Sequence, residues 1–316
     1  MTAVRLRDVS PRLAFQAHSV TTQQKVELVE RLIAAGLRAI EVSSFVHPKL
    51  VPGLADAGQV FAQVSRPAGV SLECCVGNMT GLKRAIDAGA HAAWFLLAAD
   101  EEFSKANIGR TIAESIDELA RMREVAEGSG THLGTYLIAA FGGPVGLGRG
   151  PDDVRAVANR LIELDVHDWI LADSCGYAAP PQIRDMVRFA AGLTDIKRLT
   201  VQIHDSRGMG LANVAELVAQ GVTNIDTSLA GSGGHPAAPG ANVGGTCSED
   251  VVQMLNLMDI DTGIDLTALI DAANWLNEVL GGSEKGYTRL VGGIPSTAEE
   301  LAAFRKSRGP FQWQKA

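Results

Sequence analysis

Eight short apolar runs recur along the chain, separated by longer stretches with the periodicity of amphipathic helices. In segments such as 21–37 and 81–90, apolar residues return every three or four positions, which is typical of a helix with one buried face. Several such segments end in a glycine, at Gly36, Gly89 and Gly221, where a left-handed C-cap is expected. The apolar runs are predicted to be strands, at 4–10, 39–44, 70–76, 92–98, 131–140, 168–174, 199–205 and 224–230.

This alternation of strands and helices predicts an α/β fold, a (β/α)8 TIM barrel. A doubly wound sheet is the competing fold, but no Gly-x-Gly-x-x-Gly turn follows the first strand. We predict one barrel domain over 1–316, with an appended C-terminal helical region at 262–316. Stretches with several glycines and prolines at 142–151 and 231–245 are predicted loops, and no segment has the composition of a linker between domains.

The composition narrows the class of protein and of partner. The chain has 316 residues, 46% of them hydrophobic, and its net charge of −8 disfavours a nucleic-acid surface. No apolar stretch reaches the ~20 residues that a membrane helix needs, and the N-terminus does not resemble a signal peptide. The four cysteines have no zinc-like spacing, so we expect a reduced, cytoplasmic protein.

Polar residues follow the apolar runs at the positions where a barrel carries its chemistry. In TIM barrels, active sites form at the carboxyl ends of the strands. Buried carboxylates there need partners, so any one of these residues could instead belong to a salt-bridge network that closes the barrel. As a set they predict a convergent site, made by Asp8, Arg12, Glu41, Asn78, Asp173, His204 and Asp205.

The glycine-rich segment 230–245 follows the eighth strand. Glycines allow the backbone to approach a ligand closely or to move, and His235 lies within the segment. We therefore predict an active-site flap, with a plain surface loop as the alternative. Cys175, close to Asp173, is predicted to be a packing residue and not a nucleophile.

Several stretches resemble the 3-hydroxy-3-methylglutaryl-CoA lyase family, a branch of the metal-dependent aldolase and acyltransferase barrels. The resemblance spans residues 4–305, and the segment SSFVHPKLVP is close to a signature of these lyases. It rests on VSPRLAFQ (9–16), AGLRAIEVSSFVHPKLVPGLAD (35–56), FSKANIGRTIAES (103–115), ADSCG (172–176), IHDSRGMGLAN (203–213) and AGSGGHP (230–236).

The resemblance implies roles for some residues. In the family, an arginine after the first strand stabilises a developing enolate, and this position is Arg12 here. Glu41 and Asp173 match residues that assist catalysis, and His235 replaces a loop cysteine that is an acid or base candidate. Catalytic residues are therefore expected to be Arg12, Glu41, Asp173, His204 and His235, and substrate-binding residues Gln16, His47, Asn78, Gln202 and Asn242.

The metal ligands of the family are largely missing. The aspartate that would follow the arginine is Leu13, and the first histidine of a family His-x-His pair is Gln202, so only His204 remains as a ligand. The family asparagine falls on Gly245, with Asn242 nearby as a substitute. Magnesium prefers oxygen ligands with one or two carboxylates, so we predict that the inherited Mg²⁺ or Mn²⁺ site is lost. A softer metal such as zinc, held by His18, His47 and His235, is the alternative.

Three functional hypotheses follow from these residues. The first is a carbon–carbon lyase of the retro-aldol or retro-Claisen type that cleaves a β-hydroxy acid, acyl-CoA or related compound without the family metal. In it, the guanidinium of Arg12 binds negative charge and an imidazole, of His204 or His235, acts as base. The second is a metal-dependent hydroxymethylglutaryl-CoA lyase with rearranged ligands, and the third is a non-catalytic binding protein. Self-association is a further expectation, because family members commonly form oligomers.

Overall fold

Eight parallel strands close into a barrel in the computed structural model, which describes residues 3–143, 150–234, 244–282 and 284–308. Each strand pairs with the next, and β8 closes the barrel by pairing with β1. All eight predicted strands and the TIM-barrel fold are confirmed. The strands are β1 (Arg5–Asp8), β2 (Ala39–Ser44), β3 (Ser71–Val76), β4 (Ala92–Ala98), β5 (His132–Ile138), β6 (Trp169–Asp173), β7 (Leu199–Ile203) and β8 (Asn224–Thr227).

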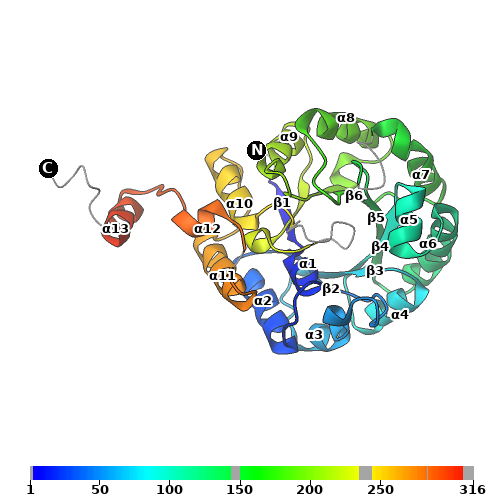
Figure 1. Ribbon diagram of the computed structural model, residues 1–316, viewed down its shortest axis with the longest axis horizontal. Coiled ribbons are helices and arrows are strands. Elements are labelled where there is room, and N and C mark those ends of the chain that lie inside the picture. Colours follow the sequence, from blue (N-terminus) through cyan, green and yellow to red (C-terminus); the bar gives the residue numbers. More distant parts are fainter. Residues whose placement is uncertain (1–2, 144–149, 235–243, 283, 309–316) are drawn as a thin grey trace.

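Helices form a ring around the barrel, as Figure 1 shows. The ring begins at α2 (Thr22–Ala34) and continues through α3 (Ala57–Gln63), α4 (Met79–Asp87), α6 (Ile112–Glu127), α7 (Pro151–Glu163), α8 (Pro180–Ala191), α9 (Gly210–Ala219) and α10 (Ser248–Leu257). Shorter elements lie in the connections: α1 (Ser10–Phe15), α5 (Glu101–Ile108), and the 3₁₀ turns η1 (Pro52–Leu54), η2 (Ile196–Arg198) and η3 (Leu229–Gly231).

The C-terminal segment continues with three more helices. Helix α11 (Leu266–Val279) packs against α2 and α10 and so lies within the ring, and α12 (Tyr287–Val291) packs on α10 and α11. Helix α13 (Ala298–Arg308) is set apart from the barrel (Figure 1). The division of the chain at residue 262 stays a prediction. Within the described ranges, no helix has the length and apolar character needed to cross a membrane.

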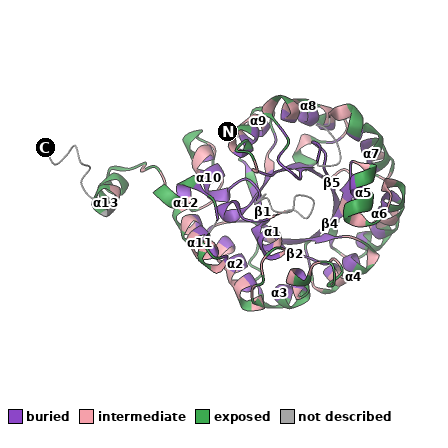
Figure 2. Cartoon of the chain, viewed as in Figure 1, coloured by how far each residue is buried: buried purple, intermediate pink, exposed green. Residues whose placement is uncertain are grey.

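The barrel has two apolar cores, because its strands are covered on both faces (Figure 2). The larger core lies between the strands and the helix ring, and Leu72, Val201 and Ile225 belong to it. The smaller one includes residues such as Cys75 and Ala172, which alternate along the strands with members of the outer core. Since successive side chains of a strand point to opposite faces, these alternate positions face the barrel interior.

Local sequence signals account for the helix ends. The side chains of Thr21 and Thr111 cap α2 and α6, each in a reciprocal capping box with the third helical residue. The predicted terminator Gly36 has a φ of 102°, in the left-handed region that a β-carbon disfavours. Gly89 and Gly221 also have positive φ, as expected.

The C-terminal end of the glycine-rich connection after β8 is tied to the end of β7. The Thr246 amide donates to the Ile203 carbonyl at 2.9 Å, and the Asp205 amide donates to the Gly244 carbonyl at 2.9 Å. His204 forms an isolated bridge with Gly245. These contacts place the base of the predicted flap beside His204, at the carboxyl end of the barrel.

Candidate active site

A network of charged side chains fills the barrel interior below the carboxyl ends of the strands. Arg7 on β1 donates from Nε to Asp226 Oδ1 at 2.8 Å and from Nη2 to Asp226 Oδ2 at 2.6 Å. Its Nη1 lies 3.0 Å from Glu73 Oε2, and its Nη2 lies 2.6 Å from the hydroxyl of Tyr136. These residues come from β1, β3, β5 and β8, so their side chains meet only because all of them point inward.

Arg12 and Glu41 form the part of this network nearest the barrel mouth. The Nε of Arg12 donates to Glu41 Oε2 at 2.5 Å, and its Nη2 lies 3.5 Å from the Tyr136 hydroxyl. Glu41 Oε1 accepts from Tyr136 at 2.9 Å and from the Cys75 thiol at 3.0 Å. The Arg12 side chain remains 12% exposed, whereas that of Glu41 is fully buried. The predicted convergence of Arg12 and Glu41 is therefore present.

Electrostatics keep this pair charged. Burial acts to raise the pKa of Glu41, but the nearby guanidiniums of Arg12 and Arg7 lower it overall. Burial also raises the pKa of Tyr136 well above its ordinary value, so the phenol stays protonated. Glu41 thus serves as a permanent anion that fixes the Arg12 guanidinium, and Tyr136 donates its proton to that anion.

The opposite side of the mouth is formed by β7 and carries little charge. Gln202 is 4% exposed, and among the described atoms its Nε2 has no hydrogen-bond partner. His204 lies two positions further along, on the same face of the chain, and is also buried. Leu13 is fully buried between the two sides: a β-carbon added to Gly245 would meet Leu13 Cδ1 at 3.7 Å. Because Gly245 pairs with His204, the segment that carries Arg12 lies next to the end of β7.

Asp8 and Asp173 have structural partners. Asp8 accepts hydrogen bonds from the backbone and hydroxyl of Ser10 and from the Ser248 hydroxyl, which ties β1 to α1 and α10. Asp173 accepts from the backbone amides of Tyr177 and Ala178, at 2.8 and 3.1 Å, and so shapes the turn after β6. Burial raises the pKa of each carboxyl to about 6. The predicted catalytic role of Asp173 stays a prediction, and this geometry favours a structural one.

The remaining predicted residues occupy varied positions. Gln16 donates to the Gly234 carbonyl at 2.5 Å and so reaches the base of the predicted flap. Asn78 caps α4 by accepting from the Gly81 amide, and His47 is exposed on the connection after β2. Cys175 is buried, and burial raises the pKa of its thiol to about 11, which agrees with packing. His235 and Asn242 lie outside the described residues.

The donor set at the mouth does not fit a Mg²⁺ or Mn²⁺ ion. Such ions take oxygen ligands with carboxylate charge, yet the position after Arg12 is the apolar Leu13, and β7 offers one amide and one imidazole. The nearby carboxylate of Glu41 is held by Arg12 and Tyr136. No group of three or more His, Cys, Asp or Glu side chains in the described part of the chain could hold a metal. The predicted site of His18, His47 and His235 includes a residue outside that part.

Four residues of the interior network are absent from the predicted site: Arg7, Glu73, Tyr136 and Asp226. They lie within the strands and not at their ends. A charged residue in the middle of an apolar run was the signal available for Arg7, Glu73 and Asp226, since burial of an unpaired charge is costly. No comparable signal marks Tyr136.

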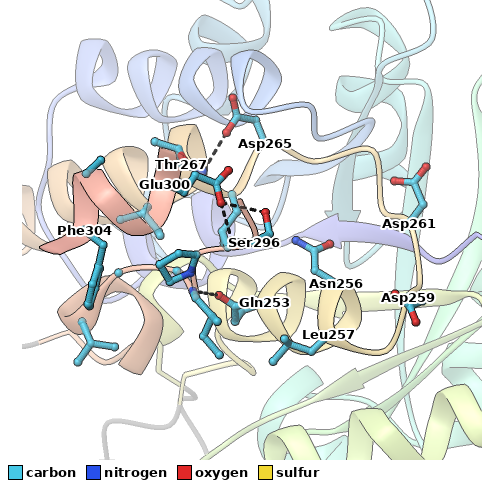
Figure 3. Close-up of a pocket in the computed structure, with 18 of the residues that line it drawn as sticks. Gln253, Asn256, Leu257, Asp259, Asp261, Asp265, Thr267, Ser296, Glu300 and Phe304 are labelled. Carbon is cyan, nitrogen blue, oxygen red and sulfur yellow. Dashed lines mark hydrogen bonds between the residues drawn. The ribbon is translucent and has the colours of Figure 1, made fainter. Parts of the chain in front are cut away.

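A separate cavity of about 930 Å³ lies outside the barrel, between α10, the start of α11 and the segment around α13 (Figure 3). Its polar residues include Asp259, Asp261 and Asp265. Its hydrogen bonds are structural: the Ile294 amide donates to Gln253 Oε1, and Ser296 donates to Glu300. It is lined by none of the predicted site residues, and we assign it no part in the chemistry.

Comparisons with known proteins agree with the fold and identify the family. The HMGL-like family model matches residues 3–276. The hydroxymethylglutaryl-CoA lyase YngG of Bacillus subtilis is 32% identical over 280 residues, which cover 88% of this chain and 93% of that protein. The (R)-citramalyl-CoA lyase of Chloroflexus aurantiacus is 36% identical over 294 residues, covering 89% and 92% of the two chains.

A solved structure of a lyase from the same family is also similar to this chain. A hydroxymethylglutaryl-CoA lyase from A. baumannii, in complex with coenzyme A and 3-methylmalate, superposes with a TM-score of 0.89 at 32% identity. The match covers 94% of this chain and 99% of that one. The two chains therefore share the barrel fold over nearly their whole length.

Proposed function

The chain belongs to the HMGL-like family, and on that premise we propose that it is a carbon–carbon lyase that cleaves a β-hydroxyacyl-CoA thioester without a Mg²⁺ or Mn²⁺ ion. The relatives are named as lyases of two such thioesters, hydroxymethylglutaryl-CoA and citramalyl-CoA. The single observation that carries the metal-free part is the donor set at the mouth, where Leu13 and Gln202 leave a guanidinium as the nearest fixed positive charge.

The proposed reaction is a retro-aldol cleavage. A base removes the proton of the substrate's β-hydroxyl group, the O–H electrons form a carbonyl, and the bond between the α and β carbons breaks. The electrons of that bond move to the thioester oxygen as an enolate, which is then protonated on carbon. Negative charge builds up on the β-oxygen and passes to the thioester oxygen as the carbon–carbon bond breaks, so fixed donors in a site shielded from water lower the barrier.

Arg12 is proposed to bind the thioester oxygen as the enolate forms. Glu41 engages Nε, and Nη2 lies 3.5 Å from the Tyr136 hydroxyl, whereas the described residues offer Nη1 no hydrogen bond. A guanidinium is suited to this role because it is always charged and presents paired donors to an oxygen. Gln202 Nε2, buried without a partner in the part of the chain described, is proposed to donate to another substrate oxygen.

His204 is proposed as the base. Its position beside Gly245 puts it at the mouth, and imidazole titrates near neutral pH. His235, which lies outside the described residues, is a second candidate within the same proposal.

The proposal is tested by assaying the purified protein with a panel of β-hydroxyacyl-CoA thioesters and measuring release of the smaller thioester. Wild type is expected to cleave at least one member. Arg12→Ala and His204→Ala should each lose on the order of 10²- to 10³-fold in kcat, the usual loss for an oriented donor or base. Arg155→Ala, which removes an exposed arginine paired with Asp152, is the matched control. Wild-type turnover in both site variants, or no cleavage by wild type, would contradict the assignment.

A cytoplasmic location and self-association complete the proposal. The cytoplasmic location is supported by the reduced-type cysteine pattern, since Cys74, Cys75, Cys175 and Cys247 are all free and buried. Self-association is proposed from membership of the family alone. Light scattering on the purified chain decides the second point: a mass of one chain at all concentrations would contradict self-association.

A further inference from the structure

We infer that Arg7 is a positioning residue for the proposed reaction: it neutralises the carboxylates inside the barrel and thereby leaves the outer nitrogens of Arg12 available to substrate. The inference rests on the proposed function for its catalytic part. Its structural part, the effect of Arg7 on the geometry of Arg12, stands independently.

Arg7 lies between all three carboxylates of the interior. It forms two hydrogen bonds with Asp226 and one with Glu73, and its Nη1 is 3.7 Å from Glu41 Oε1. Its guanidinium carbon also lies 5.0 Å from the ring centre of Trp94, whose Nε1 donates to Glu73 Oε2 at 2.6 Å. The Arg7 side chain is only 5% exposed, so it is held in one place by these contacts.

The charges explain why Arg7 matters to Arg12. The interior holds three carboxylates, Glu41, Glu73 and Asp226, against two guanidiniums, those of Arg7 and Arg12. Charges interact strongly in a buried environment, where water screens them little. Arg5 also reaches this network, with its Nη2 3.7 Å from Glu73 Oε1, but its side chain is 53% exposed. Without Arg7, Arg12 would therefore be the one buried guanidinium left among the described residues of the network, and its Nη nitrogens would be drawn toward the carboxylates instead of the mouth.

Tyr136 provides the link between the two arginines. Its hydroxyl oxygen accepts from Arg7 Nη2 at 2.6 Å, so its proton is free to be donated to Glu41 Oε1 at 2.9 Å. With Oε1 engaged by Tyr136 and the Cys75 thiol, Glu41 meets Arg12 through Oε2 and the single Nε contact. A single contact fixes the direction of the guanidinium while leaving its outer edge unpaired with Glu41.

The test uses a double variant that preserves the charge of the interior. Arg7→Met/Asp226→Asn removes one positive and one negative group, so the protein is not left with an additional buried charge. Wild type, this variant, Tyr136→Phe and the exposed control Arg155→Met are compared by melting temperature, kcat and KM on the substrate that wild type cleaves best.

The inference predicts that the double variant, though folded, loses roughly 10- to 100-fold in kcat, while KM changes less than about threefold, because the enolate charge exists only in the transition state. Tyr136→Phe should also lower kcat more than it changes KM, but by a smaller factor. A purely structural role for Arg7 would give wild-type kcat in every folded variant, and that result would overturn the inference.

A crystal structure of the double variant tests the inference without activity. We expect Arg12 to rotate so that an Nη nitrogen as well as Nε contacts Glu41. An Arg12 that keeps its single contact would overturn the inference even if kcat falls. If wild type cleaves no thioester, the proposed function fails, and this structure still decides the role of Arg7. Should the double variant not fold, Tyr136→Phe replaces it in both tests. A wild-type kcat, or an Arg12 that keeps its single contact with Glu41 in the crystal structure of that variant, would then overturn the inference.

Discussion

Two sets of buried carboxylates in this barrel differ in what holds them. Glu41, Glu73 and Asp226 face the interior and are paired with guanidiniums. Asp8 and Asp173 also belong to strands, but they accept hydrogen bonds from backbone amides and hydroxyl groups. Asp8 and Asp173 are the last residues of their strands, whereas the other three lie inside theirs, but the partners that each carboxylate meets depend on where its side chain points.

The difference is one of side-chain direction. Asp8 follows Arg7 directly, and since neighbouring strand residues face opposite sides, Arg7 reaches the interior while Asp8 reaches the helix layer. The guanidiniums of Arg12 and Arg7 lower the pKa of Glu41 despite its burial, and a charged carboxylate can fix a cation in a direction useful for catalysis. A carboxylate held by neutral donors fixes the backbone instead. Variants of the two sets should therefore fail in different ways.

The largest effect is expected from Glu41→Gln, which removes the anion that fixes Arg12. We expect a loss of ~10²-fold in kcat, the lower part of the range for losing an oriented donor, because Arg12 is no longer held in one direction. Steady-state kinetics on the cleaved thioester measures this. A KM effect alone, with kcat unchanged, would show that Glu41 contributes only to substrate binding.

A second effect concerns Glu249, a carboxylate of the structural kind at the start of α10. Its Oε2 accepts from the Ala230 amide at 3.0 Å, and burial raises its pKa to about 7 from an ordinary value near 4.5. A raised pKa in the folded state means that the stability contributed by the protonated carboxyl is complete below pH 4.5 and is lost as the pH rises through 7.

Wild type should therefore become less stable between pH 5 and pH 8, by up to about 3 kcal/mol from this group. Glu249→Gln, which cannot ionise, should show a smaller decrease. Chemical denaturation at the two pH values measures both proteins. Equal pH dependence in wild type and variant would mean that Glu249 does not titrate in this range.

A smaller effect is expected from Asp173→Asn, and it separates the structural and catalytic roles of this residue. The amide group replaces one acceptor oxygen with a donor, so one of the two backbone amides of the turn loses its partner, at a cost of ~1–3 kcal/mol. The kcat of the folded variant should stay within about threefold of wild type. A much larger loss of kcat in a folded protein would restore Asp173 to the catalytic set.

The sequence was sufficient to predict the barrel but only part of the site. Strands and helix ends could be recognised because the apolar runs and the terminal glycines such as Gly36 depend on local chemistry. Arg12 was found because it follows a strand, and Glu41 was predicted as a strand-end residue although it lies inside β2. The side-chain direction of Asp8 could not be predicted. Barrel strands are buried on both faces, so the alternation of side chains along a strand does not show which side chains point into the barrel.

The interior network was missed for a related reason. Arg7, Glu73 and Asp226 lie in mid-strand, and their mutual contacts join residues up to 219 positions apart in the chain. A single sequence does not reveal which buried charges compensate each other. The prediction that the inherited metal site is lost, by contrast, rests on two positions that can be read from the sequence, Leu13 and Gln202, and it stays a prediction.

The central claim is that a guanidinium supports cleavage in place of a divalent ion. It is tested most directly by measuring kcat on the cleaved thioester before and after exhaustive chelation, with metal content determined on the same sample. We predict less than one divalent ion per ten chains and a change in kcat below about twofold, since no reaction step depends on the ion. One tightly bound divalent ion per chain, with activity lost on chelation and restored by Mg²⁺ or Mn²⁺, would contradict the claim.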